Sequence, residues 1–75
     1  MKPLWNGTFN WHGQVFEDWC RAANESLAHK LLTIRIATRV GRTTYDVRQY
    51  FNGSRDNYEI KEVKEDAQVN RKHNS

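Results

Sequence analysis

The sequence predicts an α+β fold, in which an aromatic β-hairpin at the N-terminus is followed by about three helices. Residues 4–16 alternate aromatic and polar side chains around turn-forming pairs, as the strands of a hairpin do. Residues 36–52 carry apolar side chains at helical spacing on both sides of a glycine. Residues 58–63 begin to alternate again after a loop rich in Asn, Gly and Ser, which favours a third strand.

The composition is that of one small domain. The 75 residues include three Trp, three Tyr and three Phe, and these rings supply apolar area that so short a chain otherwise lacks. We expect residues 1–64 to form the domain and the polar residues 65–75 to form a disordered tail. There is no apolar run of membrane-spanning length and no signal-peptide pattern at the start. With Cys20 as the single cysteine, these features predict a cytoplasmic protein without disulfides or a membrane anchor.

The N-terminal hairpin has two candidate turns. Asn6-Gly7 lies between aromatic residues, and His12-Gly13 lies between two further aromatic stretches. We favour the second turn, because Trp11 and Val15 then flank it, although the sequence leaves the register open. An isolated hairpin is marginally stable in water, so this one must pack on another element.

A helix is predicted directly after the hairpin. Glu17 and an adjacent aspartate would occupy its first turn, where the helix dipole favours acids. Phe16, Trp19, Cys20 and Ala23 would form its apolar stripe. On such a stripe Cys20 is interpreted as a buried structural thiol.

Residues 26–40 predict the next helical stretch, either as one helix or as two, with Thr33 capping the second. Its inward residues are expected to be Leu27, Leu31, Leu32 and Ile34. Residues 58–63 are assigned to a strand that pairs with the hairpin, although Ile60 and Val63 would also fit a helical stripe.

The stretch from residue 36 to residue 52 predicts two helices joined by a tight turn. Gly41 can adopt the positive φ that ends the first helix. Thr43 and Asp46 have the spacing of a capping box for the second helix. The inward residues are Ile36, Ala37 and Val40 before the turn, and Val47, Tyr50 and Phe51 after it.

This pattern, Ile36-Ala37-x-x-Val40-Gly41-x-Thr43-x-x-x-Val47-x-x-x-x-Asn52-Gly53-Ser54, resembles the helix-turn-helix of the lac-repressor and phage Cro families of DNA-binding proteins. The resemblance covers residues 36–54 and implies a helix-turn-helix domain, winged-helix-like if residues 58–63 form a strand. One position departs from the family pattern: Arg42 stands where those families usually have an inward Val or Ile. An arginine stem can cover apolar surface while its charged head stays in water.

The resemblance implies a small DNA-binding regulator of the phage, prophage or plasmid type, which reads double-stranded DNA through a recognition helix at about 43–52. The residues expected to contact bases are Thr44, Tyr45, Arg48, Gln49 and Asn52. The residues expected to contact phosphates are Arg35, Arg39, Arg42, Thr43 and Arg55.

The charge distribution agrees with this prediction. The net charge is only +3, but residues 35–55 hold five arginines against a single acid. Arginine is the side chain best shaped to bind phosphate and guanine. The alternative interpretation is an ordinary solvated helix face.

Other functions remain as alternatives. Trp5, Phe9 and Trp11 could present an aromatic surface to a protein partner, as in a small phage-type inhibitor or accessory protein, or could stack RNA bases. The same hairpin could be a homodimer interface, or it could complete the core of the monomer. No metal-binding spacing, catalytic triad or phosphate-binding loop is present, so no enzyme activity, metal or cofactor is expected.

Overall fold

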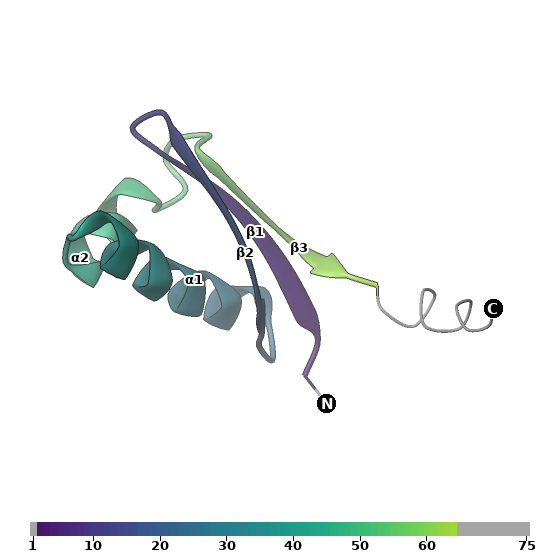
Figure 1. The fold of residues 1–75 in the computed structure, drawn as a ribbon. Coiled ribbons are helices and arrows are strands. Elements are labelled where there is room, and N and C mark those ends of the chain that lie inside the picture. The colour runs from purple at the N-terminus through teal and green to yellow at the C-terminus, as the bar shows by residue number, and fades with distance from the viewer. Residues whose placement is uncertain (1, 65–75) are drawn as a thin grey trace.

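The computed structural model describes residues 2–64, and the predicted tail at 65–75 lies outside the described residues. Strands β1 (Leu4–Trp11), β2 (Gln14–Arg21) and β3 (Tyr58–Val63) form an antiparallel sheet in the order β2-β1-β3. Helices α1 (Glu25–Val40) and α2 (Thr44–Tyr50) lie on one side of this sheet (Figure 1). The α+β class is confirmed, with two helices in the described residues where about three were predicted.

The hairpin turns at the second of the two candidate sites, as predicted. Trp11 pairs with Gln14, and the two residues between them, His12 and Gly13, both have positive φ, at 49° and 92°. Tight hairpin turns of this length favour such left-handed residues. The Asn10 side chain closes the turn by accepting a hydrogen bond of 2.7 Å from the Gly13 amide.

The predicted strand at 58–63 is also confirmed. It forms β3 and pairs with β1 as an antiparallel neighbour, so β1 is the central strand. Helix α1 packs against all three strands of the sheet.

The helix predicted after the hairpin is wrong, because this stretch is strand β2. Phe16 and Cys20 are four residues apart, and that spacing shares one side in a strand as well as in a helix. Trp19 distinguishes the two: a helix would turn it inward, whereas in β2 it lies on the open face of the sheet, 47% exposed. The segment pairs with β1 along its whole length, and this pairing makes it a strand.

Residues 25–40 form one helix. Asn24 caps it by accepting a hydrogen bond of 3.0 Å from the Leu27 amide. Thr33 is buried inside the helix and donates to the His29 carbonyl at 2.9 Å, so it does not cap a second helix.

The expected inward placement of Leu27, Leu31 and Ile34 is wrong. These side chains are 44%, 40% and 41% exposed and face away from the sheet. Leu32 is buried as predicted. The physical reason is that, within residues 2–64, the sheet and α2 cover α1 on one side only, and no described element packs on the apolar residues of its other side.

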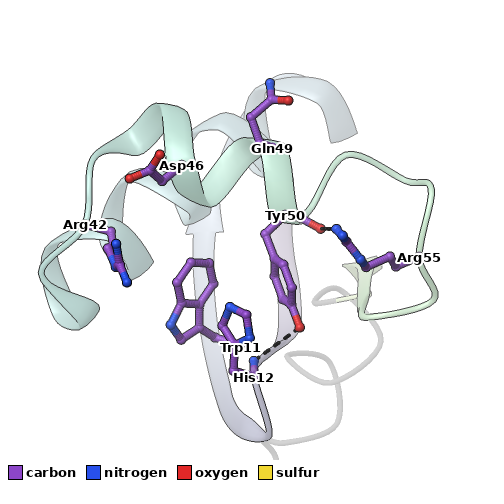
Figure 2. Close-up of a pocket in the computed structure, with 7 residues that line it drawn as sticks. All are labelled: Trp11, His12, Arg42, Asp46, Gln49, Tyr50 and Arg55. Carbon is purple, nitrogen blue, oxygen red and sulfur yellow. Dashed lines mark hydrogen bonds between the residues drawn. The ribbon is translucent and has the colours of Figure 1, made fainter.

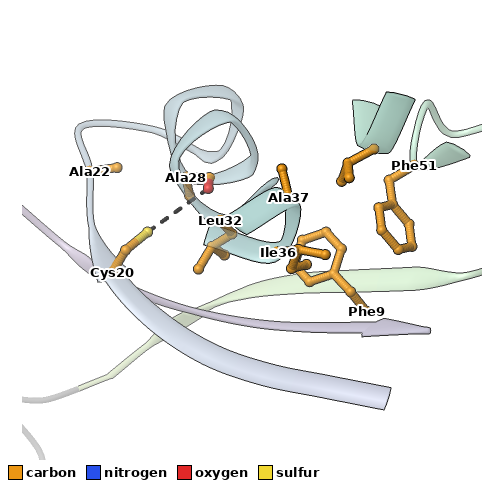
Figure 3. Packing of buried hydrophobic residues seen from close by; sticks show 9 residues of the cluster. Phe9, Cys20, Ala22, Ala28, Leu32, Ile36, Ala37 and Phe51 are labelled. Atoms are coloured by element: carbon orange, nitrogen blue, oxygen red, sulfur yellow. Dashed lines mark hydrogen bonds between the residues drawn. The ribbon is translucent and has the colours of Figure 1, made fainter. Parts of the chain in front are cut away.

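The core lies between the sheet and the two helices (Figure 3). Phe9 of β1 is at its centre, only 1% exposed, with its ring stacked on Tyr58 at 5.4 Å and edge-to-face with Phe51 at 5.0 Å. The buried apolar residues are Phe9, Cys20, Ala22, Ala28, Leu32, Ile36, Ala37, Val47 and Phe51.

The aromatic hairpin therefore completes the core of its own chain. Phe9 is inaccessible to a partner, which corrects its assignment to a protein interface. Trp5 is half-buried and donates a 2.9 Å hydrogen bond from its indole nitrogen to the Ala22 carbonyl. Trp11 is half-buried against Tyr50. Neither described helix is long and apolar enough to cross a membrane.

Candidate functional site

The turn between α1 and α2 positions the candidate site. Gly41 ends α1 with φ of 70°, and the Arg42 amide donates to the Ala37 carbonyl at 3.0 Å. Thr43 then caps α2 by accepting a hydrogen bond of 3.1 Å from the Asp46 amide. The predicted two helices and their Gly turn are thus present in this structure.

Buried apolar residues hold α2 against the rest of the molecule. Val47 and Phe51 are completely buried, and His29 of α1 lies with its ring nitrogen 2.8 Å from the Phe51 carbonyl oxygen. On the opposite side of α2, no other element of residues 2–64 covers the exposed Tyr45 and Gln49. The core therefore fixes the orientation of α2, as any surface that presents side chains to a ligand requires.

The five residues predicted to contact bases differ in how exposed their side chains are. Tyr45 is 71% exposed, and Gln49 and Asn52 are also exposed. Thr44 and Arg48 are half-buried, and the Arg48 Nε donates to the Thr33 hydroxyl of α1 at 3.4 Å. Tyr45 and Gln49 are the outermost side chains of α2 among the predicted contacts.

The structure separates the predicted phosphate-binding arginines into two groups. Arg35 is held on the β2 side of α1, where it donates to the Asp18 carboxylate at 3.1 Å and to the Trp19 carbonyl at 2.7 Å. Arg39 lies over the Phe16 ring at 5.4 Å. Neither is a neighbour of the outer side of α2.

Arg42 and Arg55 are brought together with Gln49 at a pocket of about 300 Å³ beside α2 (Figure 2). Thr43 remains at the start of α2 as its cap. The pocket is lined by residues from the hairpin tip, the interhelical turn, α2 and the loop after it: Trp11, His12, Arg42, Asp46, Gln49, Tyr50 and Arg55.

Aromatic rings build one wall of this pocket. The rings of His12 and Tyr50 are stacked at 4.4 Å, and the Tyr50 hydroxyl accepts a hydrogen bond of 3.3 Å from the His12 amide. Trp11 meets both rings edge-to-face, at 4.7 and 5.0 Å. Arg55 lies over the Tyr50 ring at 4.8 Å and donates to the Tyr50 carbonyl at 3.3 Å.

Sequence reasoning missed this pocket as a site. It assigned Tyr50 to the core, Asp46 to a cap and Trp11 to a protein interface, and it gave His12 only a turn. The signal in the sequence was the pair of adjacent rings at the hairpin turn, Trp11 and His12. A ring at a turn lies at the edge of the core, so it has few buried neighbours to pack against. Tyr50 of α2 is 38 residues away from His12, so only the tertiary structure brings the two rings together.

Cys20 is buried in the core, away from the pocket. Burial raises the pKa of the Cys20 thiol, an effect that nearby Arg35 opposes and Asp18 reinforces. The thiol lies 3.9 Å from the Ala28 carbonyl oxygen inside the core (Figure 3). Within residues 2–64, no group of three or more His, Cys, Asp or Glu side chains could hold a metal ion.

Comparison with protein-family models, with curated proteins and with solved structures finds no match to this chain.

Proposed function

We propose that this chain is a small regulator that binds double-stranded DNA and reads base edges with α2. The observation that carries the proposal is the uncovered side of α2, where Tyr45 and Gln49 project from a helix fixed by Val47 and Phe51. A capped helix after a Gly turn, with polar side chains outward, has the layout of a helix-turn-helix recognition helix. The resemblance of residues 36–54 to the lac-repressor and Cro families supports the same assignment.

In this proposal Gln49 pairs with adenine and Arg48 with guanine, the bases whose major-groove edges match an amide and a guanidinium. Arg48 would first release its hydrogen bond to Thr33, which at 3.4 Å is a weak one. Arg42 and Arg55 would contact phosphates beside α2. Of the four arginines expected to contact phosphates, these two lie at the pocket beside α2.

The hairpin tip at His12 stands beside α2 and would serve as the wing of a winged-helix protein. The 3.3 Å hydrogen bond between the His12 amide and Tyr50 fixes the tip to α2. A wing adds contacts to the adjacent backbone, and a single recognition helix needs such additional contacts to discriminate specific from random DNA.

Selection of a preferred duplex from a random library, followed by fluorescence anisotropy, tests the proposal. Gln49→Ala and Arg48→Ala should each weaken binding to the selected duplex by about 1–3 kcal/mol and relax base choice at one position. Lys30→Ala, an exposed change on α1, is the control and should leave base choice unaltered. Failure to select any duplex over random sequence would refute the proposed function.

Salt dependence tests the phosphate contacts separately. Arg42→Ala and Arg55→Ala should weaken specific and random duplexes alike, and each should lower the salt slope by about 0.9, the value for one phosphate that is no longer neutralised. Arg35→Ala should change the slope less, because that side chain is engaged with Asp18.

The second candidate function is binding of a protein partner. The observation that favours it is the exposed apolar stripe of Leu27, Leu31 and Ile34 on α1, whose four- and three-residue spacing suits docking against another helix. An affinity for duplex DNA that is absent or independent of salt would favour this candidate over DNA binding.

A further inference from the structure

We infer that the pocket between the hairpin tip and α2 binds an unpaired nucleotide, with its base stacked on Trp11 and its phosphate held by Arg42. This inference adds a ligand class to the proposed nucleic-acid surface and rests on that proposal for its biological setting. Its chemistry comes from the pocket itself, which combines aromatic, cationic and hydrogen-bonding side chains in about 300 Å³.

The aromatic wall offers a place for one more planar ring. Trp11 is half-buried, and it meets His12 at 86°, Tyr50 at 71° and Phe51 at 51°. None of these three rings lies parallel to the indole of Trp11. Nucleobases stack in parallel on aromatic side chains, largely without regard to sequence.

The charged rim suits the phosphate of the same ligand. Figure 2 shows Trp11 between Arg42 on one side and the stacked His12 and Tyr50 on the other. Arg42 is exposed, and its guanidinium makes no hydrogen bond or ion pair within the described part of the chain. Arg55 lies over the Tyr50 ring, on the other side of Tyr50 from Trp11 (Figure 2). Arg42 is therefore the cation placed to meet a phosphate next to a base stacked on Trp11.

Asp46 of α2 provides a hydrogen-bond acceptor for the base. It lines the pocket together with Gln49, whose amide points away from Trp11 (Figure 2). A carboxylate accepts hydrogen bonds from the exocyclic amino groups of bases. The carboxylate would also disfavour a ligand that carries several phosphates, so a single phosphate fits best.

The ligand must be unpaired. In a duplex both faces of a base are covered by its neighbours in the stack, so a ring can lie on Trp11 only when the base has left the stack or was never in one. The volume is at the lower end of the range of about 300–1,000 Å³ typical of small-ligand pockets, which matches one nucleotide. A free mononucleotide and a nucleotide within a single strand share this chemistry.

The experiment measures binding of a fluorescein-labelled oligodeoxyadenylate decamer to the full chain at low salt by anisotropy, with dAMP as competitor. We expect Trp11→Leu and Arg42→Ala each to weaken binding by at least about 5-fold, the lower end for loss of one stacked base. Lys30→Ala removes the same charge from the outer part of α1 and should change the affinity by less than about 2-fold. Competition by dAMP would identify the mononucleotide as sufficient, and its failure would identify the strand as the ligand.

Thermal melting followed by circular dichroism shows whether Trp11→Leu remains folded. If Trp11→Leu is unfolded, the affinity of Arg42→Ala alone decides the test, because the Arg42 side chain is exposed and outside the core. Duplex binding without single-strand binding would overturn this inference and leave the proposed function standing. Single-strand binding that Arg42→Ala leaves unchanged would also overturn it. Single-strand binding without duplex binding would support the pocket and refute the duplex function.

Discussion

Gly7 provides the space in which Leu32 packs on the sheet. It lies in the central strand β1, and a Cβ atom there would be 2.6 Å from Leu32 Cδ1 and 2.7 Å from Phe9 Cε1. Both neighbours are core side chains that are only 1% exposed. They have no solvent side toward which they could move.

Gly7→Ala should therefore destabilise the fold by about 1–3 kcal/mol through overpacking. Urea denaturation measures the change, and Thr8→Ala, on the open face of the sheet, is the neighbouring control. A Gly7→Ala protein as stable as the control would show that Leu32 and Phe9 can shift without cost.

Cys20 should make stability depend on alkaline pH. Burial raises the pKa of its thiol in the folded state, so the unfolded chain loses this proton first as the pH rises through the ordinary thiol pKa of 9.0. The contribution to stability is fully present below that pH and is lost as the pH rises from there through the raised pKa of the folded state. Urea midpoints at about pH 7 and 9.5 should thus differ more for the parent protein than for Cys20→Ala. An identical difference in both proteins would contradict the prediction.

At the scale of the elements, α1 carries two adjacent leucines with opposite surroundings. Leu32 is 1% exposed against the sheet, whereas Leu31 is 40% exposed on the outer side. Leu32→Ala should lower the free energy of unfolding by about 2–5 kcal/mol, because it leaves a cavity. Leu31→Ala should change it by only about 0.5 kcal/mol, because that side chain packs against few other atoms.

Denaturation of these two variants side by side checks the orientation of α1. Equal losses of stability would mean that the outer stripe is covered in solution, as it would be in an oligomer. The pair is matched in chemistry and position, so helix propensity cancels between the variants.

The cap of α2 is expected to matter because that helix has only seven residues. Thr43→Ala removes the acceptor of the Asp46 amide and should cost about 1 kcal/mol. Thr38→Ala is the control: this threonine is exposed within α1 and bonds only to the Ile34 carbonyl. Denaturation midpoints of the two variants test the cap, and a larger destabilisation by Thr38→Ala would reject it.

At the scale of the whole molecule, the sequence is compatible with either a monomer or a homodimer that associates through the hairpin. The central ring of the hairpin, Phe9, lies in the core, so the expected dimer surface would have only the half-buried Trp5 and Trp11. The exposed apolar stripe of Leu27, Leu31 and Ile34 is only three side chains long. Stable interfaces bury about 1,200–2,000 Å² in total, more than this stripe can supply.

We therefore expect a monomer of 8.9 kDa in sedimentation velocity at micromolar concentration without DNA. A dimer that Leu31→Glu converts to a monomer would instead assign the stripe on α1 to self-association. A dimer that survives this substitution would require a different surface.

The sequence predicted the local features correctly where short-range chemistry decides them. The turn at His12-Gly13 follows from the need for positive φ, and the cap at Thr43 follows from its spacing to Asp46. The strand at 58–63 was also correct. The prediction failed at Phe16–Ala23, since two apolar side chains four residues apart satisfy both periods, and only pairing with β1 distinguishes them.

The candidate site was predictable in part for the same reason. Tyr45 and Gln49 were placed outward from the helical period alone, and they are exposed. The separation of Arg35 and Arg39 from Arg42 and Arg55 was not predictable, because adjacency in the sequence does not tell which side of α1 faces β2.

The sequence by itself thus determined the α+β class, the Gly41 turn with its capped second helix, and the concentration of arginine between residues 35 and 55. Each of these depends on residues within a few positions of one another. Only the tertiary structure decided that Leu27, Leu31 and Ile34 are exposed, that Phe9 is buried, and that His12 lies on Tyr50. Those outcomes depend on which face of each element is covered, and coverage is a property of contacts between segments far apart in the chain.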